Sequence, residues 1–239
     1  MKGKLILLVL GLLALALVAL TFPYPAHAQA YQCRLPQRIE PYAAPQPDGP
    51  PRLAPISGYT LAASWSPAYC RDDHTTMQCS GRNGRFGFIL HGLWPESNNG
   101  APPQWCAIQL RPEPELLRRN LCMTPHAPLL EHEWAKHGSC MTKTPEAYFR
   151  TASILWNSLR WPDADRLSRQ DGLTAGDLRS AFLAANPDWK RRQIGLVTSQ
   201  NGWLKEVHLC YGRNFMPVDC DRRSFGPVDA AELRIWRGL

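Results

Sequence analysis

The stretch QIGLVTSQNGWLKEVHLCY, residues 193–211, carries the clearest folding signal in the chain. Two apolar runs, 193–198 and 203–211, flank Gln200-Asn201-Gly202, and an Asn-Gly pair between such runs favours a β-hairpin. Residues 59–65 place Tyr, Leu, Ala and Trp at alternate positions, as expected of a strand with one buried face. These patterns predict an antiparallel sheet.

Helices and one further strand complete the expected fold. Residues 85–90 should form a strand that ends at His91-Gly92. Thr144-Pro145-Glu146 has the N-cap, first-turn proline and acidic residue of a helix start, and Thr174 with Asp177 resembles a capping box. Strands and helices do not alternate as in a doubly wound sheet. We therefore expect a single α+β domain with a central antiparallel sheet and flanking helices.

Composition sets limits on size and organisation. A chain of 239 residues that is 44% apolar can bury one sizeable core or two small ones, and it has the bias of neither a collagen nor a coiled coil. Residues 29–56 hold seven prolines and little periodicity, which indicates an extended N-terminal arm. The catalytic domain is expected over residues 57–239.

The first residues resemble a secretory leader. Lys2 and Lys4 precede an apolar run of 16 residues, followed by Ala26-His27-Ala28, a small-x-small cleavage site. The alternative is a membrane anchor, but the run falls short of the ~20 residues that a spanning helix needs. Cleavage after Ala28 would leave 211 residues and lower the formal charge from +7 to +5. We expect a secreted or periplasmic protein with no membrane contact after leader removal.

Eight cysteines in such a chain favour disulfides formed in an oxidising compartment. Cys70 and Cys79 could close a small loop, and Cys210 and Cys220 could bridge the ends of a hairpin. Sequence alone leaves ~105 connectivities open. No paired C-x-x-C spacing is present, so a cysteine metal site is not expected.

Two short segments carry the residues expected to do chemistry. The first is His91-Gly92-Leu93-Trp94-Pro95-Glu96, and the second is residues 131–140, EHEWAKHGSC. Pro128 can begin a helix there and Gly138 can end it. On that helix Glu133 and His137 lie four residues apart, as do His132 and Lys136, which places each pair on one face.

Protease assignments do not fit the second segment. A His-Glu-x-x-His zinc site needs a histidine at position 136, which is Lys, and His132 and His137 are five residues apart. A cysteine nucleophile at Cys140 would need a free thiol, whereas an even cysteine count favours a bridge. Ser139 has no G-x-S-x-G context.

Two histidines, a lysine and a glutamate suit metal-free RNA cleavage. Imidazole has a pKa of about 6.5, so one histidine can act as base while another acts as acid. Cations offset the charge that develops on the phosphoryl oxygens. RNA supplies its own nucleophile, the 2′-hydroxyl, so neither a metal nor another cofactor is required.

Two plainer interpretations stand beside this one. The 132–137 cluster could be a solvated charged helix face, and the chain could be a secreted binding module without turnover. We assign His74, His126 and His208 to structural or solvated roles, and Trp134 to the core.

At these two segments the sequence resembles the ribonuclease T2 family of secreted acid endoribonucleases. The resemblance implies cleavage of single-stranded RNA through a 2′,3′-cyclic phosphate to a 3′-phosphate, by a monomer. It implies His137 as the general base, His91 as the general acid, and Glu133 and Lys136 as supports of the transition state. It further implies that His132 binds phosphate, Trp94 stacks on a base and Glu96 contacts a base.

The resemblance also implies four disulfides. The sequence departs from the family pattern at two places. The implied bridges are Cys70–Cys79, Cys106–Cys140 and Cys210–Cys220, with Cys33–Cys122 as the remaining pair. Ser64-Trp65-Ser66-Pro67 stands where many members have Gln-Trp-Pro. No tyrosine follows Trp94 in the loop where some members carry a second stacking residue, and Trp105 is a possible substitute.

Overall fold

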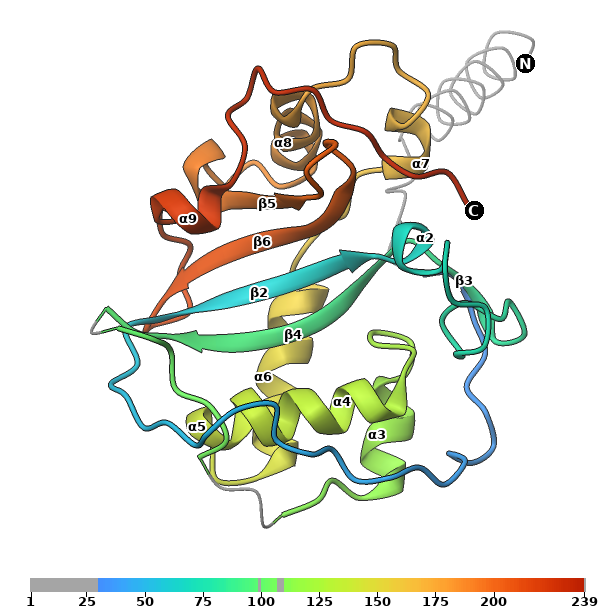
Figure 1. Cartoon of the computed structure of the whole chain (residues 1–239), viewed down its shortest axis with the longest axis vertical. Coiled ribbons are helices and arrows are strands. Elements are labelled where there is room, and N and C mark those ends of the chain that lie inside the picture. The colour runs from blue at the N-terminus through green and yellow to red at the C-terminus, as the bar shows by residue number, and fades with distance from the viewer. Residues whose placement is uncertain (1–29, 99, 107–109, 239) are drawn as a thin grey trace, which may run out of the picture.

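The computed structural model describes residues 30–98, 100–106 and 110–238, so the expected leader over residues 1–28 lies outside it. Four antiparallel strands form the central sheet in the order β4-β2-β6-β5 (Figure 1). They are β2 (Gly58–Trp65), β4 (Phe88–Glu96), β5 (Ile194–Thr198) and β6 (Leu204–Gly212). A second small sheet pairs β1 (Ala30–Cys33) with β3 (Gly84–Phe86). The α+β class with an antiparallel sheet is confirmed.

Short helices flank the sheet. They are α2 (Ser66–Tyr69), α3 (Pro114–Asn120), α4 (Ala127–Glu133), α5 (Ser139–Met141), α6 (Pro145–Asn157), α7 (Ala164–Leu167), α8 (Ala175–Ala185) and α9 (Arg222–Phe225), with a π-helical turn η1 (Trp134–Gly138) and a 3₁₀ turn η2 (Arg191–Gln193). Both expected caps are present. The Thr144 side chain accepts a hydrogen bond from the Ala147 amide, and Thr174 forms the capping box with Asp177. None of the helices in the described ranges is long and apolar enough to cross a membrane.

The two faces of the sheet have different roles because strand side chains alternate. Leu61 of β2 pairs with Leu209 of β6, and both are fully buried in the main core, which also includes residues of α6 and α8. Helix α6 lies behind the sheet in Figure 1. On the opposite face, Ser64 of β2 pairs with Glu206 of β6, and both are half-buried. The polar face is therefore the one available for a site.

The expected hairpin is confirmed by the pairing of β5 with β6. The strand expected over residues 85–90 has other bounds in the structure. Gly202, in the turn between β5 and β6, has φ of +76°, a left-handed conformation that favours glycine. The expected strand over residues 85–90 is two strands: β3 belongs to the small sheet, and β4 starts at Phe88. Strand β4 also does not stop at His91 but continues to Glu96, because it pairs with β2 along its whole length.

The proline-rich arm packs against the rest of the chain. Its first residues form β1, and Cys33 is bonded to Cys122. Further along, Arg52 and Gln104 form an isolated antiparallel bridge. The structure contains the other three bridges that the resemblance implies, Cys70–Cys79, Cys106–Cys140 and Cys210–Cys220, and no free cysteine remains among the described residues.

Candidate active site

The two segments singled out from the sequence meet on the polar face of the sheet. Strand β4 supplies His91 and Trp94, and helix α4 supplies Glu133. The His91 Nε2 atom lies 3.5 Å from Glu133 Oε1, and the Trp94 Nε1–H donates a hydrogen bond of 2.6 Å to Glu133 Oε2. His137, in the π-helical turn, places its Nε2 atom 4.0 Å from Glu133 Oε2. Glu133 is thus the centre of the site, between two imidazoles.

A β-bulge places the neighbouring residues His91 and Gly92 on the same, polar face of the sheet. Ala62 of β2 pairs with Gly92, whereas the next residue, Ala63, pairs with Leu90, so His91 is the extra residue. Leu90 pairs with the core residue Ala63, so alternation already places His91 on the polar face, and the bulge keeps Gly92 and Trp94 on that face with Leu93 in the core. The Leu90 backbone makes its hydrogen bonds elsewhere: its amide donates to the Met123 carbonyl, and its carbonyl accepts from the Thr124 hydroxyl.

A π-helical turn shapes the other half of the site. The expected helix over 128–138 is α-helical only to Glu133, and the next turn is wider, with a hydrogen bond from the Ser139 amide to the Trp134 carbonyl. The Lys136 carbonyl accepts a bond of 2.7 Å from the Trp105 amide, from outside the helix. Trp134 is 2% exposed, which confirms it as core.

Glycine at position 92 allows the strand and the helix to approach closely. A Cβ at Gly92 would lie 2.0 Å from Glu133 Oε2 and 2.6 Å from Trp94 Nε1. Any other residue would therefore push Glu133 away from Trp94. Glu133 is 3% exposed, and this burial raises its pKa to about 7. At mildly acidic pH the carboxyl group is consequently protonated and can donate a hydrogen bond.

Glu206 and His208 belong to the site, although the sequence reading gave neither a functional role. Glu206 Oε1 is 2.6 Å from His91 Nδ1, and Glu206 Oε2 is 2.7 Å from His208 Nε2. His208, which we assigned to a structural or solvated role, is held by this bond to Glu206, and its ring lies edge-on to Trp94 at 5.4 Å. The sequence did contain a signal for this placement. Val207 and Leu209 are apolar and buried, so the alternation of a strand puts residues 206 and 208 together on the opposite, polar face.

The two histidines near Glu133 have opposite pKa shifts. Burial by itself lowers the pKa of His91, but the hydrogen bond to Glu206 and the charges of Glu133 and Glu206 outweigh it and hold the pKa above 6.5. Burial lowers the pKa of His137 to about 3, and the nearby charge of Lys136 adds to this effect. Burial also opposes ionisation of Glu206, yet its bonds to His208 and His91 hold its pKa far below the usual value. At mildly acidic pH, His91 is protonated and His137 is neutral.

The N-terminal arm reaches the site through Asp48. Its Oδ2 atom is 2.5 Å from Lys136 Nζ, and its Oδ1 atom accepts a bond of 3.0 Å from Trp105 Nε1. Trp105 is only 1% exposed and contacts His132 edge-on at 5.3 Å. The suggestion that Trp105 replaces a second base-stacking residue is therefore wrong, because its ring is buried beneath the arm.

The remaining expected residues lie around this centre. His132 is half-buried, and burial followed by the Lys136 charge lowers its pKa. Glu96, at the far end of β4, accepts a hydrogen bond of 2.7 Å from the Thr60 hydroxyl, and burial raises its pKa. Of the other two histidines assigned to structural or solvated roles, His74 is exposed and His126 is half-buried.

Two cavities open from His91. One, of about 460 Å³, is bounded by the arm at Ala43 and Pro45 and by His132 of α4. The other, of about 680 Å³, extends over β6 to Trp203. Within the described ranges, no three His, Cys, Asp or Glu side chains are grouped so as to hold a metal ion. The fold and the site together define an α+β protein in which two histidines flank a buried carboxyl group.

Comparisons with known proteins identify the family. The model of the ribonuclease T2 family matches residues 57–220. A probable ribonuclease of Haemophilus influenzae is 32% identical over 185 residues, which cover 71% of this chain and 63% of that protein. A ribonuclease of Aeromonas hydrophila is 36% identical over 161 residues, covering 65% of this chain and 71% of that protein. The chain belongs to the ribonuclease T2 family.

A solved structure has the same fold. RNase NT in complex with 5′-AMP superposes with a TM-score of 0.60 at 18% identity, covering 76% of this chain and 98% of that one. The alignment with the Haemophilus protein spans less than two thirds of that relative's length.

Proposed function

We propose that this protein is an endoribonuclease that cleaves single-stranded RNA by transphosphorylation. One observation carries the proposal: two imidazoles flank a buried carboxyl group, and their pKa values are shifted in opposite directions. Groups whose environments separate their pKa values in this way are suited to act as an acid–base pair. Membership of the ribonuclease T2 family supports the same conclusion.

In the proposed first step, the neutral His137 takes the proton of the 2′-hydroxyl. The 2′-oxygen attacks phosphorus, the bond from phosphorus to the 5′-oxygen breaks, and protonated His91 gives its Nε2 proton to that oxygen. The products are a 2′,3′-cyclic phosphate and a free 5′-hydroxyl. In the slower second step the roles reverse, because His91 activates water and His137 protonates the leaving 2′-oxygen, which leaves a 3′-phosphate.

The other site residues have supporting roles in this proposal. The Lys136 ammonium and the protonated Glu133 carboxyl stabilise charge on the phosphoryl oxygens, and His132 binds phosphate. Glu206 is a positioning residue, since its bond to His91 Nδ1 leaves Nε2 facing Glu133. The assignments of Trp94 to base stacking and Glu96 to base contact stay predictions.

The test is the product formed from a short RNA in the presence of EDTA. We expect a 2′,3′-cyclic phosphate by mass spectrometry, and no reaction when the scissile ribose is replaced by 2′-deoxyribose. His91→Phe and His137→Phe should each lose turnover, whereas His74→Phe, at an exposed position, should keep it. Cleavage of the 2′-deoxy substrate would exclude the mechanism.

The proposal includes secretion or export to the periplasm, as a monomer with RNA as its partner. Four disulfides support an oxidising compartment. N-terminal sequencing of the exported protein should begin at Gln29, and size-exclusion chromatography should give one subunit. A protein that keeps residues 1–28 would instead indicate that this segment is a membrane anchor.

A further inference from the structure

Helix α9 packs on the same face of the sheet as the catalytic groups. Gly195 of β5 pairs with His208 of β6, so both residues belong to the polar face. A Cβ at Gly195 would lie 2.0 Å from the Ser224 carbonyl oxygen of α9 and 3.3 Å from His208 Cβ. Glycine at this position therefore allows α9 to lie directly beside His208, and Figure 1 shows α9 next to β5.

The row of paired residues that ends at α9 begins at the buried carboxyl group of the site. Ala62 of β2 pairs with Gly92 of β4 on one side and with His208 on the other. Gly92 lies against Glu133 at the β4 end of this row, and Gly195 lies against α9 at the β5 end. Three strand spacings, about 14 Å, separate the two ends. Helices α4 and α9 thus lie on opposite sides of the polar face.

A buried arginine that the proposed chemistry does not use fixes α9 in this place. Arg179 of α8 is 0% exposed. Its guanidinium group stacks on the Phe225 ring at 3.8 Å, and at 2.7 to 3.0 Å it donates hydrogen bonds to the carbonyl oxygens of Ile194, Phe225 and Pro227 and to Asp229 Oδ1. Breaking bonds to a buried charge is costly, so the position of α9 relative to β5 is well determined.

Two arginines of α9 are available to an anionic ligand. Arg222 and Arg223 are exposed, and neither forms an ion pair with another side chain in the described part of the chain. The acidic residues that precede them are already engaged. Asp221 caps α9 through a hydrogen bond to a backbone amide of the helix, and Asp219 pairs with Arg192 at 2.9 Å. Two guanidinium groups are left without a partner at the edge of the polar face.

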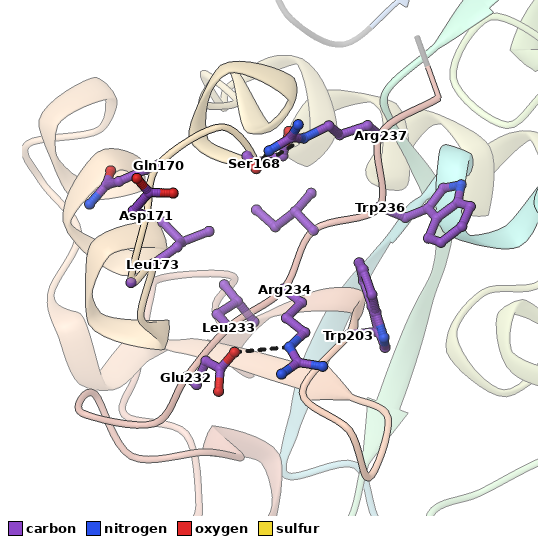
Figure 2. A pocket seen from close by; sticks show the side chains of 12 residues that line it. Ser168, Gln170, Asp171, Leu173, Trp203, Glu232, Leu233, Arg234, Trp236 and Arg237 are labelled. Atoms are coloured by element: carbon purple, nitrogen blue, oxygen red, sulfur yellow. Dashed lines mark hydrogen bonds and ion pairs between the residues drawn. The ribbon is translucent and has the colours of Figure 1, made fainter.

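Arginines around another cavity differ from this pair. Figure 2 shows that cavity, with Arg234 and Arg237 on its wall. Arg234 is bonded to Glu232 at 2.9 Å, and Arg237 donates a hydrogen bond of 2.7 Å to the Ser168 carbonyl. These basic groups are engaged within the protein, and none of the catalytic histidines lines this cavity. The arginines of α9 are thus better placed to meet a substrate.

The direction of the RNA chain across the polar face rests on the proposed function. His137 takes the proton of the 2′-hydroxyl, so the nucleotide on the 5′ side of the scissile bond lies at His137. The ring of Trp94, the residue predicted to stack on its base, lies 5.5 Å from the His137 ring and 5.4 Å from the His208 ring. A nucleotide that extends from His137 over Trp94 toward His208 presents its own 5′-phosphate to α9.

We propose that Arg222 and Arg223 bind the RNA phosphate that lies one nucleotide upstream, on the 5′ side, of the scissile phosphate. A guanidinium group is planar and matches the oxygens of a phosphate in a bidentate pair. Helix α9 begins two residues after the region that matches the family model, so the two arginines lie outside that region. The first bond after a 5′-hydroxyl end has no upstream phosphate. The enzyme should therefore cut internal bonds of RNA faster than that first bond.

Three dinucleotides test this site, because each contains only one bond that can be cut. One has no terminal phosphate, one has a 5′-phosphate, and one has a 3′-phosphate. For the wild type at low salt, we expect the 5′-phosphate to raise kcat/KM about fivefold, the upper range for one exposed charge pair, and the 3′-phosphate to have a smaller effect. No gain, or an equal gain from either phosphate, would overturn the site while leaving the ribonuclease activity intact. Failure to cleave any of the three would overturn the proposed function, and the site with it.

Two double variants locate the effect. Arg222→Gln with Arg223→Gln, both at exposed positions, should bring kcat/KM for the 5′-phosphorylated dinucleotide down to that of the unphosphorylated one. Arg119→Gln with Arg150→Gln is the matched control, since it removes two exposed arginines from α3 and α6 and should keep the gain. If the α9 variant keeps the gain, or if both double variants lose it equally, the proposal is wrong.

Discussion

His91 and His137 are the same chemical group in two contrasting surroundings. His91 has a glutamate side chain at each ring nitrogen, with Glu206 at 2.6 Å and Glu133 at 3.5 Å. His137 is largely buried beside Lys136, and no described residue bonds its Nδ1 atom. Negative neighbours favour the charged imidazole, whereas burial and a positive neighbour oppose it. The protonation state of each imidazole is therefore set by these neighbours rather than by the histidine itself.

Changing Glu206 to Gln should move the basic limb of the pH–rate profile to lower pH. His91 must be protonated to act as the acid, and its pKa lies above 6.5 because of Glu206 and Glu133. Loss of the Glu206 charge lowers that pKa, so a smaller fraction of His91 carries the proton at neutral pH. We expect kcat/KM to fall about tenfold at pH 7 and less at pH 5, since acid catalysis typically contributes a larger factor in total. The measurement is kcat/KM from pH 3 to 9 on a dinucleotide.

The control for this prediction is Glu146→Gln, which removes an exposed carboxylate from the first turn of α6. The acid limb, assigned to His137 with a pKa of about 3, should remain in place in both variants. An equal loss at every pH would mean that Glu206 acts only in folding.

At the scale of elements, two irregularities build the site. The bulge in β4 places Gly92 and Trp94 on the same polar face as His91, and the π-helical turn after α4 positions Lys136 and His137. Each irregularity is held from outside its own element: the bulge by residues 123 and 124, and the turn by the Trp105 amide. The arm adds a third element, because Asp48 forms an ion pair with Lys136, the lysine that is proposed to stabilise charge on the phosphoryl oxygens.

Asp48→Asn should strengthen substrate binding. In the wild type a substrate phosphate must compete with the Asp48 carboxylate for Lys136, and Asp48 is 51% exposed, so the pair is screened by solvent. Breaking such a pair changes affinity by about two- to fivefold. We expect KM for RNA and Kd for inorganic phosphate to fall by this factor, with the larger change at low salt.

Asp188→Asn is the matched control, since it removes one exposed negative charge from the loop after α8. A rise in KM for Asp48→Asn alone would show that the carboxylate orients Lys136 instead of competing for it.

At the scale of the whole molecule, disulfides hold the arm and the site together. Cys33–Cys122 joins residues 89 apart in sequence and fastens the start of the arm to the segment between α3 and α4. Cys106–Cys140 fastens the loop that carries Trp105 to the helix that follows the π-helical turn. The arm and the loop with Trp105 are thus covalently linked to the two ends of the helical segment that carries Glu133, Lys136 and His137.

Replacing both Cys33 and Cys122 by Ser should destabilise the fold more than replacing both Cys70 and Cys79. A cross-link restricts the unfolded chain more when it closes a longer loop, and these loops span 89 and 9 residues. The expected losses in the free energy of unfolding are about 4.6 and about 2.6 kcal/mol. Urea unfolding followed by tryptophan fluorescence measures both, and the reverse order would contradict the chain-entropy account.

Much of the framework could be predicted from local patterns. The Asn-Gly turn predicted the hairpin of β5 and β6, and the caps at Thr144 and Thr174 predicted the starts of α6 and α8. These signals could be read because turns and caps depend on residues within a few positions of each other. The extent of β4 was missed, because its pairing partner, β2, is remote in sequence.

The sequence by itself determined the fold class and the residue types of the site, because periodicity, caps and the two histidine-bearing segments are local properties. Only the tertiary structure decided which groups surround each imidazole. Glu206, His208 and Asp48 come from β6 and from the arm, and no spacing within the two segments indicates them. Burial and distance between charges set the pKa values, and both exist only once segments remote in sequence have packed together.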